Sequence, residues 1–215
     1  MENSGISATE LFDQIAEEVY QKGVCLLRHG LPEALGTALA AEVRSLPEER
    51  FSRAGIGRQA DHQTVEAIRR DEICWIDKST AAGHSWLEWA DGLKQALNRR
   101  LFLGLFSFES HYAHYRAGDY YKVHLDAFRG QQNRVLTVVT YLNPDWNDKD
   151  GGELLIYPEK GSKPLLKVQP EFGTVVIFLS EEFPHEVLPT MTDRYSIAGW
   201  YRINSSDSNR VDPES

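Results

Sequence analysis

The first hundred residues carry apolar positions at helical spacing, interrupted by short apolar runs. Ser7 and Glu10 have the spacing of a helix capping box. Three apolar residues then recur on one helical face: Leu11, Ile15 and Val19. Glycine commonly ends a helix, because it adopts the left-handed conformation without strain. Gly23 is therefore the expected end of this helix. The pattern therefore predicts a helix over residues 8–21.

Two strands and a second helix are expected next along the chain. The apolar run 24–27 predicts a short strand, and Pro32 in a first turn opens a helix that continues to about Leu46. Residues 71–77 predict another strand, around Trp75.

A polar segment and a third helix complete this half. Residues 51–70 contain Ala54-Gly55-Ile56-Gly57-Arg58 and predict a long loop or hairpin of the kind that often carries function. Residues 85–101 predict a helix. Its apolar side chains are expected to be core anchors: Trp86, Trp89, Leu93 and Leu97.

From Leu103 onward, short β-branched and aromatic runs are separated by turn signals about every ten residues. These signals are Ala117-Gly118-Asp119, Asn143-Pro144-Asp145, Asp150-Gly151-Gly152 and Glu171-Phe172-Gly173. The pattern predicts antiparallel strands that close into a sandwich or jelly roll. Because helices come first and strands follow, we expect a mainly β fold buttressed by N-terminal α-helices.

Length and charge limit the possible organisation and partners. The 215 residues suit a single domain, with helical support and a functional loop over 1–102, a β core over 103–203 and a flexible tail over 204–215. A formal net charge of −9 argues against an extended nucleic-acid or anionic-membrane surface. No stretch approaches the roughly 18 apolar residues of a membrane span.

The two cysteines indicate the compartment. Cys25 and Cys74 each lie inside an apolar run, which favours buried free thiols over a disulfide. The N-terminus is polar and lacks the apolar core of a signal peptide. We therefore expect a cytoplasmic protein.

Candidate metal ligands occur in the second half. His124 and Asp126 are two positions apart, so on one strand both would point to the same face. His185 offers a third ligand from another strand. Two imidazoles and one carboxylate leave three octahedral positions open, as in non-haem Fe(II) oxygenases. A structural zinc site would more often be closed by a fourth ligand, usually cysteine.

Arg194 begins an alternating strand whose two faces differ. Three residues share its face, two of them small: Ser196, Ala198 and Trp200. The opposite face carries mostly large apolar side chains. A buried guanidinium is costly without an anion, so an inward Arg194 predicts an anionic ligand such as a dicarboxylate co-substrate.

In the strand pattern 136–141, Thr137, Val139 and Tyr141 share one face. A phenol beside a buried arginine could donate a second hydrogen bond to the same carboxylate, so Tyr141 is a candidate donor. Two alternatives stay open. Arg194 could lie at the surface and pair with Asp193 or Glu186, and Tyr141 could be an ordinary strand aromatic.

Five motifs occur in order between Tyr115 and Tyr201. They are Tyr120-Tyr121-Lys122-Val123-His124-Leu125-Asp126, Thr140-Tyr141-Leu142-Asn143-Pro144-Asp145-Trp146, Gly151-Gly152-Glu153-Leu154, Pro184-His185-Glu186-Val187, and Arg194-Tyr195 with Trp200-Tyr201. This half resembles the prolyl 4-hydroxylase branch of the 2-oxoglutarate and Fe(II)-dependent oxygenases. It is particularly similar to the hypoxia-inducible-factor prolyl hydroxylases and their bacterial relatives. The N-terminal half matches through Gly23-Val24-Cys25 and Ile73-Cys74-Trp75-Ile76.

The resemblance implies a double-stranded β-helix of the cupin type and a role for each site residue. His124, Asp126 and His185 would be catalytic iron ligands. The residues implied at the 2-oxoglutarate are Arg194 at its distal carboxylate, Tyr141 beside it, Tyr115 near its metal-bound end, and Leu154 and Trp200 as pocket walls.

Substrate residues follow from the same resemblance. Arg69 and Trp75 match substrate-facing positions, and the loop 51–70 resembles a mobile finger that closes over the substrate. The chain departs from the family over 127–133, near where specificity is set. This segment contains Arg129, which we take as a further candidate for substrate binding.

The implied reaction is trans-4-hydroxylation of a prolyl residue, with release of succinate and CO2. Fe(II), 2-oxoglutarate and O2 are the expected cofactor and co-substrates, and ascorbate is a candidate stimulant. The expected partner is a protein with an exposed proline-containing loop, for which a translation component is one candidate. We expect a monomer, with no nucleic-acid or membrane partner.

Three alternatives remain open on the sequence. The same chemistry could act on free proline or another small molecule. Oxidative demethylation of nucleic acid is a second, which the acidic charge disfavours. The third is a non-catalytic β-helix protein that binds a metal or a ligand.

Overall fold

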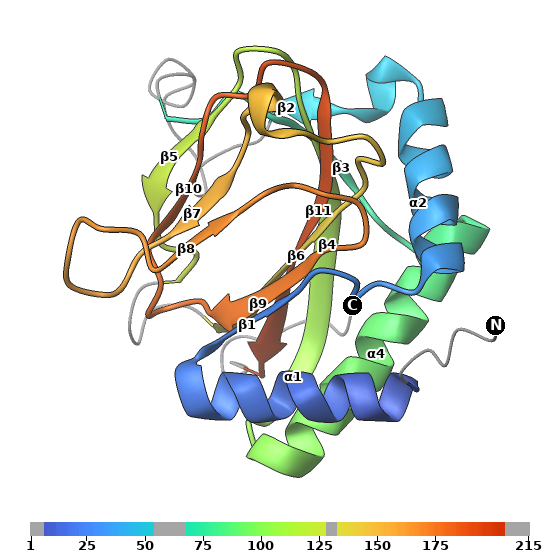
Figure 1. Cartoon of the computed structure of the whole chain (residues 1–215). Coiled ribbons are helices and arrows are strands. Elements are labelled where there is room, and N and C mark those ends of the chain that lie inside the picture. Colours follow the sequence, from blue (N-terminus) through green and yellow to red (C-terminus); the bar gives the residue numbers. More distant parts are fainter. Residues whose placement is uncertain (1–6, 54–67, 128–132, 205–215) are drawn as a thin grey trace, which may run out of the picture.

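Two antiparallel β-sheets face each other, and three α-helices cover the outer side of the larger sheet (Figure 1). The computed structural model describes residues 7–53, 68–127 and 133–204. Within that part, the α-helices are α1 (Ala8–Lys22), α2 (Glu33–Ser45) and α4 (Ala81–Leu101). Single 3-10 turns are formed by η1 (Glu48–Arg50) and η2 (Asp148–Asp150).

The strands from the first half of the chain are β1 (Val24–Leu27), β2 (Ser52–Arg53) and β3 (Glu72–Trp75). The others are β4 (Leu105–Tyr115), β5 (Tyr121–His124), β6 (Arg134–Tyr141), β7 (Leu154–Ile156), β8 (Leu166–Val168), β9 (Val175–Leu179), β10 (His185–Val187) and β11 (Arg194–Ile203).

Local side-chain chemistry sets the helix ends. The Ser7 side chain accepts from the Glu10 amide and the Glu10 side chain from the Ser7 amide, so the predicted capping box is confirmed. Gly23 ends α1 in the left-handed region, with φ at 69°. The prediction that the third helix begins at Ser85 was wrong, because the Thr80 hydroxyl accepts from the Gly83 amide and α4 begins at Ala81.

The larger, seven-stranded sheet has the order β1-β9-β6-β11-β4-β3-β2. The N-terminal half therefore supplies both edges of this sheet as well as the helices. The smaller, four-stranded sheet has the order β5-β10-β7-β8. Two layers of antiparallel strands with helices outside form the cupin-like jelly roll predicted from the sequence.

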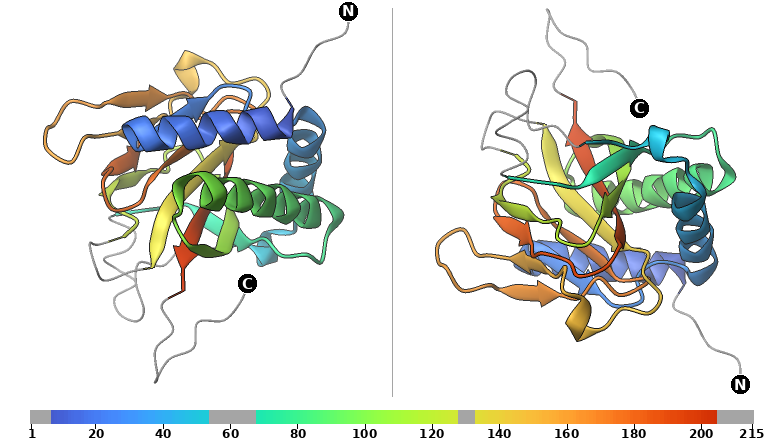
Figure 2. Two further views of the ribbon diagram at one scale, coloured as in Figure 1. Left: turned by 90° about the horizontal axis from the view of Figure 1, so that it is seen from below. Right: turned by 90° about the horizontal axis from the view of Figure 1, so that it is seen from above.

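Alternation along the strands separates two cores, on opposite faces of the larger sheet. On the outer face, Tyr112, Ile197 and Tyr201 pack with the helix residues Trp86 and Leu93. Figure 2 shows α1 and α4 lying side by side over this face. The other core lies between the sheets and is formed by residues such as Tyr115, Tyr141, Leu154, Phe178 and Val187.

Two smaller expectations can be compared with the structure. Cys25 and Cys74 are both free and buried, as predicted. No helix in the described part of the chain is long and apolar enough to cross a membrane. Residues 54–67 of the predicted loop and 205–215 of the predicted tail lie outside the described residues, as does Arg129.

Candidate metal centre and anion pocket

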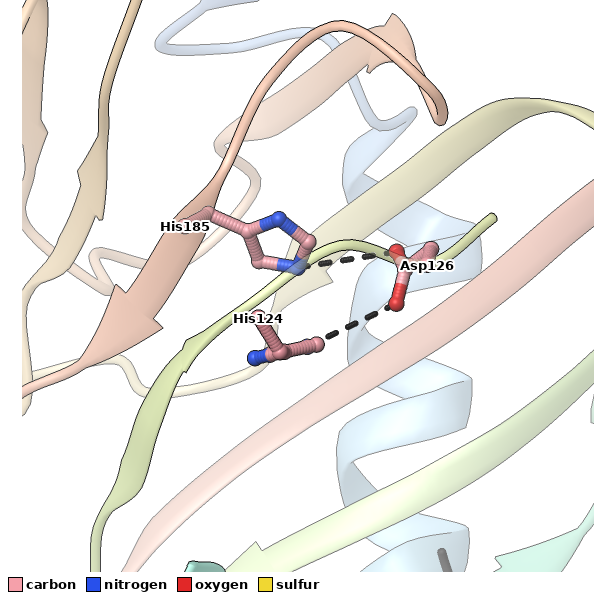
Figure 3. Close-up of side chains that lie close together, drawn as sticks. All are labelled: His124, Asp126 and His185. Carbon is pink, nitrogen blue, oxygen red and sulfur yellow. Dashed lines mark ion pairs between the residues drawn. The ribbon is translucent and has the colours of Figure 1, made fainter. Parts of the chain in front are cut away.

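His124, Asp126 and His185 come together between the two sheets, with one ligand atom of each within 4.8 Å of the others (Figure 3). His124 ends β5 and His185 begins β10, and the two are direct partners across the smaller sheet. Their Nε2 atoms each lie 3.5 Å from an Asp126 oxygen. Strand geometry was the wrong reason for placing Asp126, because β5 ends at His124 and Asp126 occupies the bend that follows.

Backbone carbonyls orient both imidazoles. His124 Nδ1 lies 2.8 Å from the carbonyl oxygen of Lys122, and His185 Nδ1 lies 3.0 Å from that of Phe183. A carbonyl oxygen only accepts, so Nδ1 carries the proton in each ring and Nε2 presents a lone pair to the centre. Both rings are therefore oriented so that Nε2 can bind a metal.

The Asp126 carboxylate is also oriented. The Thr137 hydroxyl donates to Asp126 Oδ2 at 2.8 Å, and Ser180 Oγ lies 2.9 Å from the same hydroxyl. Burial alone would raise the pKa of Asp126, but His185 and His124 lower it well below its usual range. Burial lowers the pKa of His185 to about 4. At neutral pH His185 is therefore a neutral imidazole and Asp126 an ionised carboxylate.

Arg194 is buried, with 1% of its surface exposed. Its Nε donates to the Gly152 carbonyl at 2.9 Å, and its Nη1 donates to Ser196 Oγ at 3.1 Å. The guanidinium carbon lies 4.8 Å from the Tyr115 ring centre and 5.1 Å from that of Tyr141. Among the described residues no carboxylate pairs with Arg194, which excludes the alternative of a surface arginine paired with Asp193 or Glu186.

Two further donors near Arg194 and the triad lack a partner. Tyr141 is directly opposite Ser196 across β6 and β11, and its buried hydroxyl has no hydrogen-bond partner among the described residues. Trp200 lies directly opposite Thr137, and its buried Nε1 makes no hydrogen bond of ordinary geometry among the described residues, although the side chain lies near enough to Asp126 to help lower the pKa of that carboxyl. Buried donors are normally satisfied. An anion between the metal centre and Arg194 would satisfy them, and the donor set therefore fits a dicarboxylate.

The remaining predicted pocket residues line the same space. Tyr115 is directly opposite Arg194 across β4 and β11, and Leu154 packs into the core between the sheets. Burial raises the pKa of Tyr115, and it raises that of Tyr141 to about 12 despite the opposing effect of Arg194. Both phenols therefore keep their protons at neutral pH and act as donors.

The predicted substrate residues lie in different settings. Trp75 is 51% exposed, and its ring meets the buried His111 edge-on at 5.3 Å. Arg69 is largely buried, and it forms a two-pronged ion pair with Asp71. Their roles toward a substrate stay predictions.

Sequence analysis missed several residues that support the site. Thr137 and Ser180 orient the carboxylate, Tyr121 stacks on His124, and His111 contacts the Trp200 ring at 5.4 Å. Thr137 shares a strand face with Tyr141, which was the one signal in the sequence that could have identified it.

Comparisons with known proteins agree with this geometry. Residues 110–202 match the model of the 2OG-Fe(II) oxygenase superfamily. A crystal structure of a Pseudomonas putida prolyl-4-hydroxylase is similar, with a TM-score of 0.81 and 38% identity over 90% of this chain and 100% of that chain. A Trichoplax adhaerens prolyl hydroxylase, in complex with a hypoxia inducible factor oxygen degradation domain peptide fragment, has a TM-score of 0.78 and 28% identity. That likeness covers 91% of this chain and 90% of the other.

Among curated proteins, human Egl nine homolog 1 is 30% identical over 190 residues. This region comprises 83% of the present chain and 43% of the human protein. The chain thus spans less than half the length of that relative.

Proposed function

The chain belongs to the 2OG-Fe(II) oxygenase superfamily, and we propose that it hydroxylates a prolyl residue of a protein substrate to trans-4-hydroxyproline. The triad of possible metal ligands, together with the buried Arg194 guanidinium that has no carboxylate partner among the described residues, is the observation that carries this proposal. It accounts for both a metal and an anionic co-substrate.

The residues of the chain divide the work. His124, Asp126 and His185 would hold Fe(II) at one face and leave the opposite face open. Arg194 and the Tyr141 hydroxyl would bind the distal carboxylate of 2-oxoglutarate. With Fe(II), 2-oxoglutarate and O2 bound, the chemistry supplied is insertion of one oxygen atom into a C–H bond, with conversion of 2-oxoglutarate to succinate and CO2.

Apolar side chains surround the tyrosines beside Arg194 and would exclude water from a bound co-substrate. Leu154, Ile156 and Val187 of the smaller sheet pack around the tyrosines of the larger sheet. Exclusion of water strengthens the pairing between Arg194 and a carboxylate, because the charges are less screened there. Donors already fixed in the protein reorganise little when the co-substrate binds.

Similarity to prolyl hydroxylases supports proline as the target. The Pseudomonas putida enzyme matches over the whole of its chain, and the structure of the Trichoplax adhaerens enzyme is a complex with a peptide fragment. We therefore favour a proline in an exposed protein loop over free proline.

The test uses whole proteins and free proline side by side. The Fe(II)-loaded protein, 2-oxoglutarate and O2 are incubated with a protein lysate or with free proline, and the products are analysed by mass spectrometry. We expect a one-oxygen gain on a protein-bound proline, absent with Asp126→Ala. Oxidation of free proline alone would overturn the protein-substrate assignment, and oxidation of neither would overturn hydroxylation of proline.

Further properties belong to this proposal. We propose a monomer in the cytoplasm, stimulated by ascorbate, with a translation component as a candidate target. Two buried free thiols support a reducing compartment. The three most exposed large apolar residues of the described part are Tyr20 in α1, Phe102 just after α4 and Met191 between β10 and β11; they come from three separate segments, which supports a monomer. Light scattering with size-exclusion chromatography would test the monomer, since a dimer mass would contradict it.

A further inference from the structure

Residues 68–71 are joined to the strand that carries His124. The Lys122 amide donates to the Ile68 carbonyl at 2.9 Å, and the Arg70 amide donates to the Tyr120 carbonyl at 3.1 Å. Arg69 and Tyr121 face each other as an antiparallel bridge. This segment therefore extends the edge of the smaller sheet at β5, next to the candidate metal centre.

A buried ion pair fixes the side chain of Arg69. Its Nε and Nη2 donate to the two Asp71 oxygens at 2.8 and 2.6 Å. The exposed fractions of the two side chains are 11% and 0%. Both Asp71 oxygens are used, and the pairing is of the two-pronged kind that restricts geometry most.

The guanidinium of Arg69 in turn contacts the aromatic ring beside the metal centre. Its central carbon lies 4.3 Å from the Tyr121 ring centre. The Tyr121 ring stacks on the His124 ring, with centres 3.6 Å apart and planes at 11°. The second restraint on His124 comes from the same strand, because its Nδ1 donates to the Lys122 carbonyl.

We propose that Arg69 and Asp71 are positioning residues, which act through Tyr121 to hold the ring of His124 in the orientation that binds the metal. The inference rests on the proposed function, since it takes the triad as a metal site. It assigns Arg69 a different role from that of a direct substrate contact. By reciprocity, metal binding would also stabilise the arrangement of residues 68–71.

Metal affinity without substrate tests this role. Mn(II) is titrated into the metal-free protein, and the free ion is followed by electron paramagnetic resonance, well below the unfolding temperature. Partners that orient a metal ligand typically contribute tenfold or more to affinity, so Arg69→Met and Tyr121→Leu should each weaken Mn(II) binding by roughly tenfold. Tyr121→Phe keeps the stacked ring and should stay within about twofold of the wild type.

Two further variants separate positioning from general damage. Asp71→Asn keeps the shape of the side chain and removes the charge pair, and we expect the same direction of change as for Arg69→Met. Arg28→Met is the matched control, because Arg28 pairs with Glu171 at the surface and contacts no part of the triad. The Arg69→Met and Tyr121→Leu effects should be less than additive when combined, because both act on one ring.

The possible results differ for the two proposals. If Arg69→Met and Asp71→Asn keep the Mn(II) affinity of the wild type, the positioning role is overturned, whatever happens to activity. If Asp126→Ala also keeps that affinity, the triad is not a metal site and the proposed function fails as well. If only Asp126→Ala weakens Mn(II) binding, the positioning role fails but the proposed function stands.

Discussion

The two faces of the larger sheet bury polar groups in different ways. On the face toward the helices, the Tyr201 hydroxyl donates to the Ala90 carbonyl at 2.7 Å, and Trp86 Nε1 donates to Ser110 Oγ at 2.9 Å. On the face toward the smaller sheet, the Tyr141 hydroxyl and Trp200 Nε1 have no partner among the described residues. The donors named on the first face are satisfied within the protein, whereas those named on the second face lack partners without a ligand.

This difference identifies a binding site without reference to any relative. Unsatisfied buried donors cost free energy, and folded proteins keep few of them. Here two of them lie near a buried arginine and a metal-binding triad. Trp89 Nε1 is also unsatisfied, but it belongs to the helix layer, where its ring packs against Phe12. A single unsatisfied donor would be weak evidence for a ligand, whereas several donors close together indicate a site for an anion.

The largest expected effect is at the triad. Asp126→Ala removes the only carboxylate of the cluster, and we expect metal binding to weaken by more than about 100-fold and turnover to be lost. Calorimetric titration with Mn(II) would measure the change. Glu171→Ala removes a carboxylate at the surface and should bind as the wild type does. Equal affinity in both variants would contradict the assignment of the triad.

Arg194→Met should weaken 2-oxoglutarate binding to the Mn(II)-loaded protein by at least roughly 30-fold, since truncating one partner of a buried charge pair costs about 2 kcal/mol or more. Arg44 offers a matched control on the opposite face of β11, where its guanidinium lies 4.7 Å from the Tyr195 ring. Arg44→Met should leave the 2-oxoglutarate affinity unchanged. If both variants bind alike, Arg194 is not the anion partner.

The buried His111, on the face of the larger sheet toward the smaller sheet, should make the stability of the protein depend on pH. Burial lowers its pKa to about 4, whereas an unfolded chain has a histidine pKa of about 6.5. Between these values the unfolded state binds a proton that the folded state does not, so stability falls as the pH drops from 6.5 to 4. Denaturation of the metal-free protein would measure the free energy of unfolding at pH 7 and at pH 4.5. The decrease between the two pH values should be about 2 kcal/mol smaller in His111→Gln than in the wild type. Equal losses would contradict this account of His111.

The smallest effects separate the two faces most clearly. Tyr201→Phe removes the hydrogen bond from the Tyr201 hydroxyl to the Ala90 carbonyl and should lower the free energy of unfolding by about 1 kcal/mol, with 2-oxoglutarate affinity unchanged. Tyr141→Phe removes a hydroxyl that has no partner, so the metal-free protein should keep its stability while 2-oxoglutarate affinity falls by roughly fivefold. Thermal unfolding and titration of both variants would check this. If Tyr201→Phe and Tyr141→Phe changed stability and 2-oxoglutarate affinity in the same way, the proposed difference between the two faces of the sheet would be contradicted.

The fold was largely predictable because local signals were strong. The capping box at Ser7, the stop at Gly23 and the alternation from Arg194 to Tyr201 each depend on residues close in sequence. The start of α4 was missed because Thr80 precedes the apolar pattern by several positions. The Thr80 hydroxyl could have been proposed as a helix cap from the sequence, but many other serine and threonine residues could have been proposed as well.

The candidate site was predictable only in its first layer. The sequence indicated four residues whose polar or charged side chains need a ligand or a partner when they are buried: His124, Asp126, His185 and Arg194. Their supports are distant in sequence, as when Thr137 donates to Asp126 and Arg69 meets Tyr121. No local pattern records such contacts, because the packing of the two sheets creates them.

One measurement tests the oxygenase assignment without knowledge of the substrate. The Fe(II)-loaded protein is incubated with 2-oxoglutarate, ascorbate as reductant and isotopically labelled O2, and the succinate is analysed by mass spectrometry. We predict slow release of succinate that contains one labelled oxygen atom, and its loss in Asp126→Ala. Absence of succinate, or succinate without the label, would contradict the assignment of this site to 2-oxoglutarate-dependent oxidation.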